Sequence, residues 1–200
     1  MATMVAKTKL KKAERTRQQL LDAALRIIGR KGYTSATVDE IVKEAGVSKG
    51  VAYYHFKSKA DMASGILSKG LNDVAVQFQS IARESNNAAS ALTSMLQLFA
   101  SQLYDNREFA RFLMTELWRD GRAWSQAMRT RVEELIDIIA AQIARGQEEG
   151  ILRESLDPRF TAVSIIGLVV TDAMYYAGIE GEPLMDKAAF TDHIQNFARH

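Results

Sequence analysis

The residues best suited to a chemical task lie in the run KGVAYYH, residues 49–55. On a helix, this run places Gly50, Val51 and Tyr54 on one face. Glycine allows close backbone approach, valine can contact a thymine methyl group, and a tyrosine hydroxyl can bond to phosphates or base edges. Such a face suits the groove of a DNA duplex better than it suits water. The alternative interpretation is an ordinary helical hairpin that exposes some aromatic side chains.

Two short helices and a tight turn must position this run. Thr37 and Glu40 have the spacing of a capping box at the start of the first helix. Gly46 follows the last apolar residue of that helix, where a left-handed cap costs glycine least. Ser48 can cap the second helix. This arrangement over residues 37–56 is the spacing of a helix-turn-helix.

The same stretch resembles the TetR family of one-component repressors. The matching residues are TVDEI at 37–41, AGVSKG at 45–50, and then Tyr53, Phe56 and Lys59. The resemblance implies a DNA-binding head that enters the major groove through residues 49–55 and contacts phosphates through its flanks. The DNA-binding residues that it implies are Thr37, Ser48, Lys49, Gly50, Val51, Tyr53, Tyr54, His55 and Lys59.

The charge is distributed unevenly along the chain. Residues 1–60 hold 13 Lys and Arg against 5 Asp and Glu, a net charge of +8, whereas residues 61–200 hold 13 against 19, a net charge of −6. The basic part carries the motif, as a nucleic-acid module should. We therefore expect a DNA-binding domain at 1–57, with a basic N-terminal arm over residues 1–12, and a second domain at 58–200.

The composition favours an all-α fold of about nine helices, because the chain has only two prolines and is rich in helix-forming residues. The apolar spacing predicts a long helix that starts at Ser58 and connects the two domains. The remaining spacing and caps predict helices over about 13–31, 37–45, 49–56, 90–104, 107–118, 126–149, 158–178 and 184–198.

The stretch 160–179 is nearly all apolar and could be taken for a membrane span. Asp172 near its middle would cost roughly 2.5–3.5 kcal/mol on insertion scales, and no basic cluster flanks the stretch. We expect a buried helix and no membrane partner. The absence of cysteine and of a signal peptide fits a cytoplasmic protein.

No motif for catalysis stands out. The three histidines, His55, His193 and His200, form no closely spaced set of metal ligands. A glycine-rich phosphate loop and a nucleophile elbow are both missing from the sequence. We therefore expect no catalytic residues, no metal and no cofactor. An enzyme or carrier with an accessory DNA-binding head is the less favoured class.

The resemblance also implies that the C-terminal domain binds a small molecule. Its helices carry many methionine and aromatic side chains, which suit an adaptable apolar pocket of about 300 Å³ or more. A plain hydrophobic core would explain any one of them as well. Polar groups among them could orient an anionic amphiphile such as a fatty acid or acyl thioester. The expected lining is Met95, Phe99, Arg111, Phe112, Trp118, Trp124, Met128, Thr171 and Tyr175.

Dimerisation is expected through the last two helices. Both faces of residues 160–179 are apolar, and one monomer can cover only one of them. Pairing across a two-fold axis is the commonest solution. The expected interface residues are Val163, Gly167, Val170, Met174, Phe190 and Phe197.

Together these features predict a homodimeric, ligand-responsive transcriptional repressor. It would read a near-palindromic DNA operator and leave it when a small hydrophobic or amphipathic effector binds. The alternative is a constitutive DNA-binding protein without an effector, which would need no apolar cavity.

Overall fold

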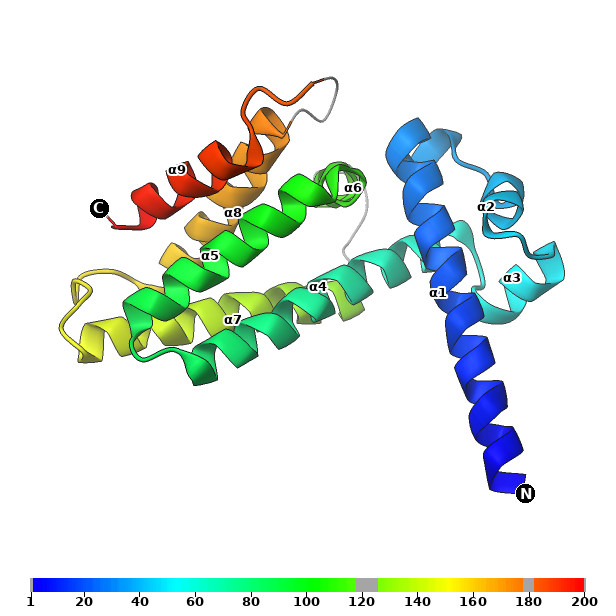
Figure 1. Cartoon of the computed structure of the whole chain (residues 1–200), viewed down its shortest axis with the longest axis horizontal. Coiled ribbons are helices and arrows are strands. Elements are labelled where there is room, and N and C mark those ends of the chain that lie inside the picture. The colour runs from blue at the N-terminus through cyan, green and yellow to red at the C-terminus, as the bar shows by residue number, and fades with distance from the viewer. Residues whose placement is uncertain (1, 118–125, 178–181, 200) are drawn as a thin grey trace. The chain divides into compact units, whose positions relative to one another are not determined.

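The computed structural model describes residues 2–117, 126–177 and 182–199, and every secondary-structure element assigned there is an α-helix. The prediction of an all-α fold is therefore confirmed (Figure 1). The helices are α1 (Ala2–Ser35), α2 (Val38–Ala45), α3 (Lys49–His55), α4 (Lys59–Glu84), α5 (Ala88–Asp105), α6 (Arg107–Leu117), α7 (Gln126–Glu148), α8 (Pro158–Tyr176) and α9 (Lys187–Arg199).

The chain separates into two compact units, the head (Met1–Leu67) and the C-terminal unit (Ser68–His200). The division falls inside α4, ten residues beyond the position expected from the sequence. The reason lies in the first turns of α4, where Met62, Ala63 and Ile66 are buried. These turns complete the core of the head before the helix continues into the second unit.

In the head, α1 supplies the largest part of the core. Leu20, Leu21 and Ala24 are almost completely buried, as are Ile41 of α2 and Ala52 of α3. The sequence suggests a basic arm over residues 1–12 ahead of a helix at 13–31, whereas α1 begins at Ala2. Lysine, alanine and leucine have high helix propensity, so this basic segment continues the helix toward the N-terminus.

The turn between α2 and α3 follows the sequence signals closely. Thr37 and Glu40 form both bonds of the capping box. Gly46 ends α2 with φ of 66°, in the left-handed region that favours glycine. The Oγ of Ser48 accepts a hydrogen bond from the N–H of Val51 and so begins α3.

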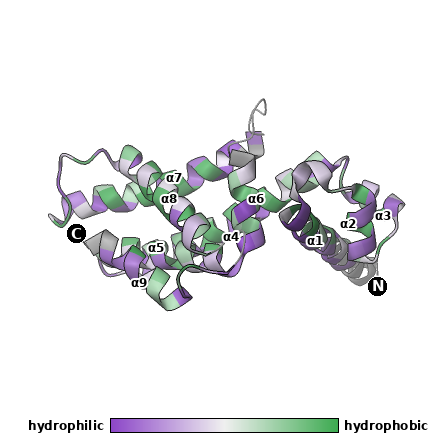
Figure 2. Ribbon diagram, turned by 90° about the horizontal axis from the view of Figure 1, so that it is seen from above, coloured by the Kyte–Doolittle hydropathy of each residue, from purple (hydrophilic) through white to green (hydrophobic). Residues whose placement is uncertain are grey.

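The C-terminal unit is a bundle in which α8 packs mainly on α7, and α5 packs mainly on α9. Figure 2 shows hydrophobic and hydrophilic residues along each helix, as amphipathic helices around a shared core require. The core includes Phe78 of α4, Met95 and Phe99 of α5, Phe112 of α6 and Ile143 of α7. Among the described residues, every helix is too short or too polar to serve as a membrane span.

The last helix starts later than predicted. The sequence suggests a start near Leu184, directly after Pro183, but α9 begins at Lys187. The carboxylate of Asp186 accepts a hydrogen bond from the N–H of Ala189 at 2.9 Å and so acts as the N-cap. The N–H of Leu184 instead donates to the carbonyl oxygen of Tyr176 at 3.0 Å, at the end of α8.

Candidate functional site

The two faces of α3 differ sharply in exposure. Ala52 is completely buried, and Phe56, which ends the helix, is 2% exposed, so this side fixes α3 in the head. The opposite side presents Val51, Tyr53 and Tyr54 at 38%, 49% and 82% exposure. These three large side chains do not contribute to the core of the head. They form an exposed surface on the outer side of α3.

Gly50 keeps this surface open. A Cβ atom built at Gly50 would have no heavy atom within 4 Å, so packing inside the head does not require glycine there. The missing side chain therefore leaves space on the outside of α3. His55 is half-buried at the end of the helix, and its ring meets that of Tyr54 edge-on, with the ring centroids 5.1 Å apart.

The cation at the start of α3 is held by a carboxylate of α2. The Nζ of Lys49 lies 2.7 Å from Oδ1 of Asp39, and this ion pair raises the pKa of the lysine. Both side chains are largely exposed, so the ion pair is weak and another anion can replace Asp39 beside the lysine. A DNA phosphate approaching α3 would compete with Asp39 for the ammonium group.

Thr37 is committed to the capping box. Its hydroxyl donates to Oε2 of Glu40 at 2.9 Å and accepts from the N–H of Glu40 at 3.2 Å. Glu40 also pairs with Lys31. That hydrogen bond to Lys31, followed by the bonds from the N–H and hydroxyl of Thr37, lowers the pKa of Glu40 to about 2.

Lys59 is placed differently from the expectation. Its Nζ donates to the carbonyl oxygens of Tyr33 at 2.6 Å, Thr34 at 3.3 Å and Ala36 at 2.7 Å. The Nζ also lies 4.4 Å from the centroid of the Tyr33 ring. The sequence resemblance suggests a phosphate contact, whereas the structure directs this ammonium group into the head.

The C-terminal unit contains a cavity lined only by apolar side chains from four helices. Its lining is Phe78 of α4, Leu92, Met95, Leu96 and Phe99 of α5, Ile139 of α7, and Ile165 and Ile166 of α8. Met95 and Phe99 are the two residues that we predicted there. The free space is only about 10 Å³, room for about one water molecule, whereas we expected about 300 Å³. The rings of Phe78 and Phe99, which both line the cavity, meet edge-on with their centroids 6.3 Å apart.

Other residues expected around the ligand lie elsewhere. Phe112 of α6 is buried in the core of the C-terminal unit but does not line this cavity. Arg111 is half-buried on the same helix. Thr171 and Tyr175 are exposed on α8, and the hydroxyl of Thr171 donates to the carbonyl oxygen of Gly167. In this protomer the two residues do not line the apolar cavity. The expected lining residues Trp118 and Trp124, and the side chain of Met128, lie outside the described residues.

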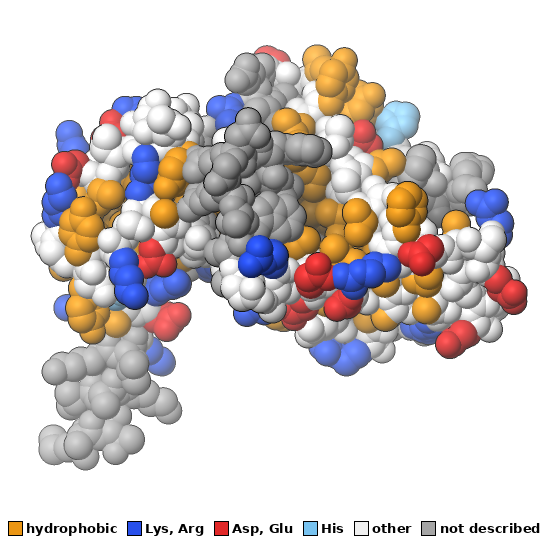
Figure 3. All heavy atoms as spheres, turned by 180° about the vertical axis from the view of Figure 1, so that it is seen from behind, with side chains coloured by type: hydrophobic (Ala, Val, Ile, Leu, Met, Phe, Trp, Pro, Cys, Tyr) orange, Lys and Arg blue, Asp and Glu red, His pale blue; other side chains and the backbone are white. Residues whose placement is uncertain are grey.

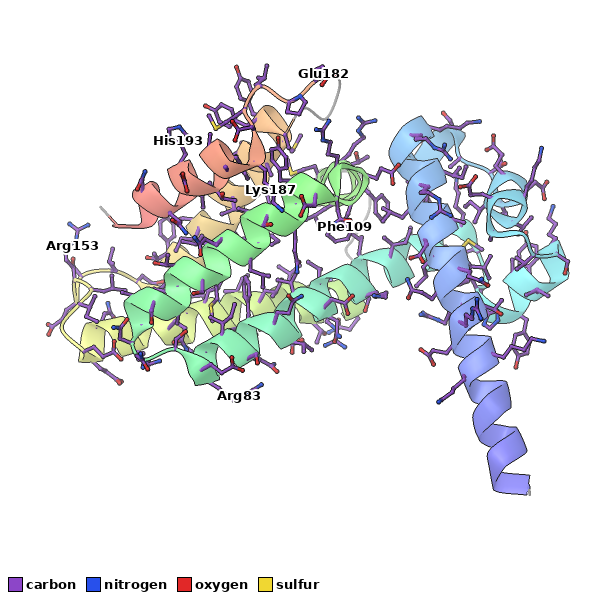
Figure 4. The ribbon with its side chains drawn as sticks, in the orientation of Figure 1. Arg83, Phe109, Arg153, Glu182, Lys187 and His193 are labelled. Atoms are coloured by element: carbon purple, nitrogen blue, oxygen red, sulfur yellow. The ribbon has the colours of Figure 1, made fainter. Side chains whose placement is uncertain are left out.

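A second, more open cavity of about 380 Å³ lies between α8 and α9. Its lining is Asp172 and Tyr176 of α8, Met185 of the connecting loop, and Phe190, His193 and Ile194 of α9. Figure 4 labels His193 on α9. Burial raises the pKa of Asp172. Within the part of the chain that the structure describes, no three His, Asp or Glu side chains lie together as a metal site would require.

One face of α8 is apolar and exposed. Phe160, Val163 and Tyr175 are 74%, 49% and 66% exposed, and the outer side of Gly167 has no heavy atom within 4 Å of a built Cβ atom. Figure 3 shows hydrophobic side chains gathered on the surface of the C-terminal unit. We call Phe160, Val163, Gly167 and Tyr175 the α8 stripe.

The remaining predicted interface residues are divided. Val170 and Phe190 are buried inside the protomer, at 4% and 1% exposure, so they support the core and offer no surface to a partner. Met174 is half-buried. The side chain of Phe197 lies outside the described residues.

Comparisons with known proteins match both units. The model of the bacterial regulatory proteins of the tetR family matches residues 20–66, and that of the tetracyclin repressor-like C-terminal domain matches residues 89–179. The fatty acid metabolism regulator protein of Bacillus subtilis (strain 168) is 24% identical over 151 residues, which cover 76% of this chain and 78% of that protein.

Two solved structures show the same fold. The transcriptional regulator FadR from Bacillus subtilis in complex with stearoyl-CoA has a TM-score of 0.81 at 22% identity, over 90% of this chain and 96% of that one. AibR in complex with isovaleryl coenzyme A and operator DNA has a TM-score of 0.72 at 18% identity, over 91% and 97%.

Proposed function

The chain belongs to the TetR family of bacterial regulatory proteins, and on this premise we propose that it is a repressor released from its operator by a fatty acyl thioester. It is a ligand-responsive DNA-binding transcriptional regulator and not an enzyme. The observation that supports the effector class is the cavity whose eight lining side chains are all apolar. The relatives named for fatty acid metabolism, and the complexes with stearoyl-CoA and isovaleryl coenzyme A, point to the same class.

The proposed DNA surface is the exposed side of α3. Gly50 admits the close approach of a base pair, and Val51, Tyr53 and Tyr54 lie on the side that the core of the head does not use. Lys49 supplies a cation that can exchange Asp39 for a phosphate. This combination of apolar, hydroxyl and cationic groups is that of a major-groove reader.

The proposed effector enters the cavity between α4, α5, α7 and α8. An acyl chain gains roughly 0.8 kcal/mol for each CH₂ group that it buries. The chain cannot fit into about 10 Å³, so the rings of Phe78 and Phe99 must move to admit it. The bound and free states therefore differ in core packing, and a difference of that kind allows a ligand to shift a conformational equilibrium. Because Phe78 belongs to α4, the shift reaches the helix that continues into the head.

We also propose that two protomers associate through the α8 stripe. Its side chains are apolar and exposed, and Gly167 permits a close approach of a second helix. The two heads of a dimer would read half-sites about one helical turn, or roughly 34–36 Å, apart. Sedimentation of Val163→Glu should then show monomers at concentrations where the unaltered protein is dimeric.

Fluorescence anisotropy of promoter DNA, measured with and without candidate ligands, tests the proposed class of effector. Stearoyl-CoA should release the DNA, whereas coenzyme A alone should not, because it lacks the acyl chain that the apolar cavity accepts. Met95→Trp fills the cavity and should weaken the response to stearoyl-CoA without lowering DNA affinity. If DNA binding is specific but no acyl-CoA of any chain length alters it, the proposed effector class is wrong.

A further inference from the structure

Lys59 is the first residue of α4, and its ammonium group is enclosed by backbone. A lysine ammonium group has three N–H donors and no acceptor. The carbonyl oxygens of Tyr33, Thr34 and Ala36 lie within 2.6–3.3 Å of Nζ, one for each donor. The Tyr33 ring covers a further side at 4.4 Å. The side chain thus has a complete set of partners inside the head.

These three carbonyl oxygens belong to the junction between α1 and α2. The backbone of Gly32 leaves the helix with φ of 77° and ψ of 158°, so the last turn of α1 follows a break. Carbonyl groups at the end of a helix lack partners within that helix and attract cations. Lys59 supplies both the hydrogen bonds and the charge. Thr37, the N-cap of α2, comes directly after this segment.

We infer that Lys59 acts in DNA recognition as a positioning residue, which fixes the α1–α2 junction to the start of α4 and does not contact a phosphate. Its removal would release the segment that precedes α2, and α2 in turn packs against α3. The exposed face of α3 would then lose its alignment with the rest of the head. Because all three N–H donors of Lys59 already have acceptors, a phosphate contact would have to replace at least one of these carbonyl oxygens.

The salt dependence of DNA binding distinguishes these two roles. Each phosphate that a protein neutralises steepens the slope of log K against log salt concentration by about 0.9. Loss of a phosphate contact therefore flattens the slope, whereas loss of a positioning contact weakens specific binding and leaves the slope unchanged. Lys49 serves as the control cation. Its ammonium group pairs with the exposed carboxylate of Asp39 and can reach a phosphate.

The experiment compares Lys59→Met and Lys49→Met in the full chain, with anisotropy titrations of promoter DNA and random DNA between 50 and 300 mM salt, a range of order a few-fold around physiological ionic strength. Lys59→Met should weaken promoter binding about tenfold or more and reduce the preference for promoter over random DNA, with an unchanged slope. Lys49→Met should flatten the slope by about 0.9. A slope that flattens by about 0.9 in Lys59→Met overturns the inference.

A measurement on the unaltered protein covers the case in which Lys59→Met does not fold. Reductive methylation followed by mass spectrometry reports the accessibility of each lysine. Lys59 should resist methylation equally with and without DNA, whereas exposed Lys49 should react in the free protein and become protected on DNA. Ready methylation of Lys59 in the free protein, with protection by DNA, would contradict the inference.

The inference rests on operator binding by the head, but the two can fail separately. If the unaltered protein shows no preference for its promoter region, the proposed DNA surface is wrong. If that preference is present and only the behaviour of Lys59 differs from expectation, the positioning role alone is wrong.

Discussion

The head and the C-terminal unit place their proposed functional residues in opposite ways. In the head, Val51, Tyr53 and Tyr54 stand exposed on a short helix, while local caps and the left-handed Gly46 hold the turn before it. In the C-terminal unit, Met95 and Phe99 are buried around a cavity that their own packing closes. A surface for rigid DNA can be built in advance from short-range interactions. A site for a flexible guest can remain collapsed until the guest separates its walls.

The same contrast appears along α4, which carries a close-packed glycine in each unit. A Cβ atom at Gly65 would lie 2.9 Å from Leu21 and 3.3 Å from Phe56, inside the head. A Cβ atom at Gly70 would clash with the ring of Phe109 on α6, inside the C-terminal unit (Figure 4). Each glycine allows side chains of its own unit to pack directly against the backbone of α4, at some cost in helix propensity.

The largest expected effect is on the stability of the C-terminal unit. Phe99→Ala removes a buried ring next to the closed cavity and should lower the free energy of unfolding by about 3–5 kcal/mol. Urea denaturation followed by circular dichroism measures this loss. A loss below about 1 kcal/mol would show that the cavity walls collapse freely, and the contrast with the preformed surface of the head would become sharper.

The next effect concerns the surface of the head. Tyr54→Ala removes a side chain that is 82% exposed, so stability should change little, whereas specific DNA binding should weaken by about 1–3 kcal/mol. Anisotropy with promoter and random DNA measures the difference. Tyr175→Ala is the matched control, since this tyrosine is 66% exposed in the other unit and should leave DNA affinity unchanged. Equal effects of the two variants would remove the functional distinction between the surfaces.

A smaller effect should follow from Asp39→Asn. This change removes the carboxylate that holds Lys49 at 2.7 Å and also takes a negative charge away from the side that approaches DNA. Promoter affinity should rise only modestly, because an exposed ion pair is weak. The gain should shrink as salt is added, because exposed charges are screened. A fall in affinity would mean that Asp39 is needed to orient Lys49.

The smallest effect is a pH dependence of the capping box. The pKa of Glu40 is lowered to about 2 from an ordinary value of 4.5, chiefly by Lys31 and then by Thr37. A lowered carboxyl pKa stabilises the folded head above pH 4.5, and this stabilisation is lost as the pH falls from there toward about 2. Thermal melts should show Glu40→Gln less stable than the unaltered protein at pH 7 and nearly equal to it near pH 2. A difference that stays constant with pH would assign the loss to side-chain geometry instead of charge.

The sequence by itself determined the helix-turn-helix of the head almost residue by residue. The capping box of Thr37 and Glu40, the left-handed Gly46 and the cap at Ser48 depend on neighbours within four residues, so spacing alone predicts them. The two faces of α3 follow from the helical period for the same reason. The all-α class also follows from composition and periodicity along the whole chain.

The tertiary structure alone decided where long side chains point and which apolar face remains uncovered. Lys59 matches a family position, but its direction depends on carbonyl groups more than twenty residues away in the chain. Thr171 and Tyr175 share a helix with cavity residues, yet the rotation of α8 against α7 leaves them exposed. Residue types reveal that a core is apolar, but the volume left inside it depends on how side chains from four helices interdigitate, and no short-range pattern contains that information.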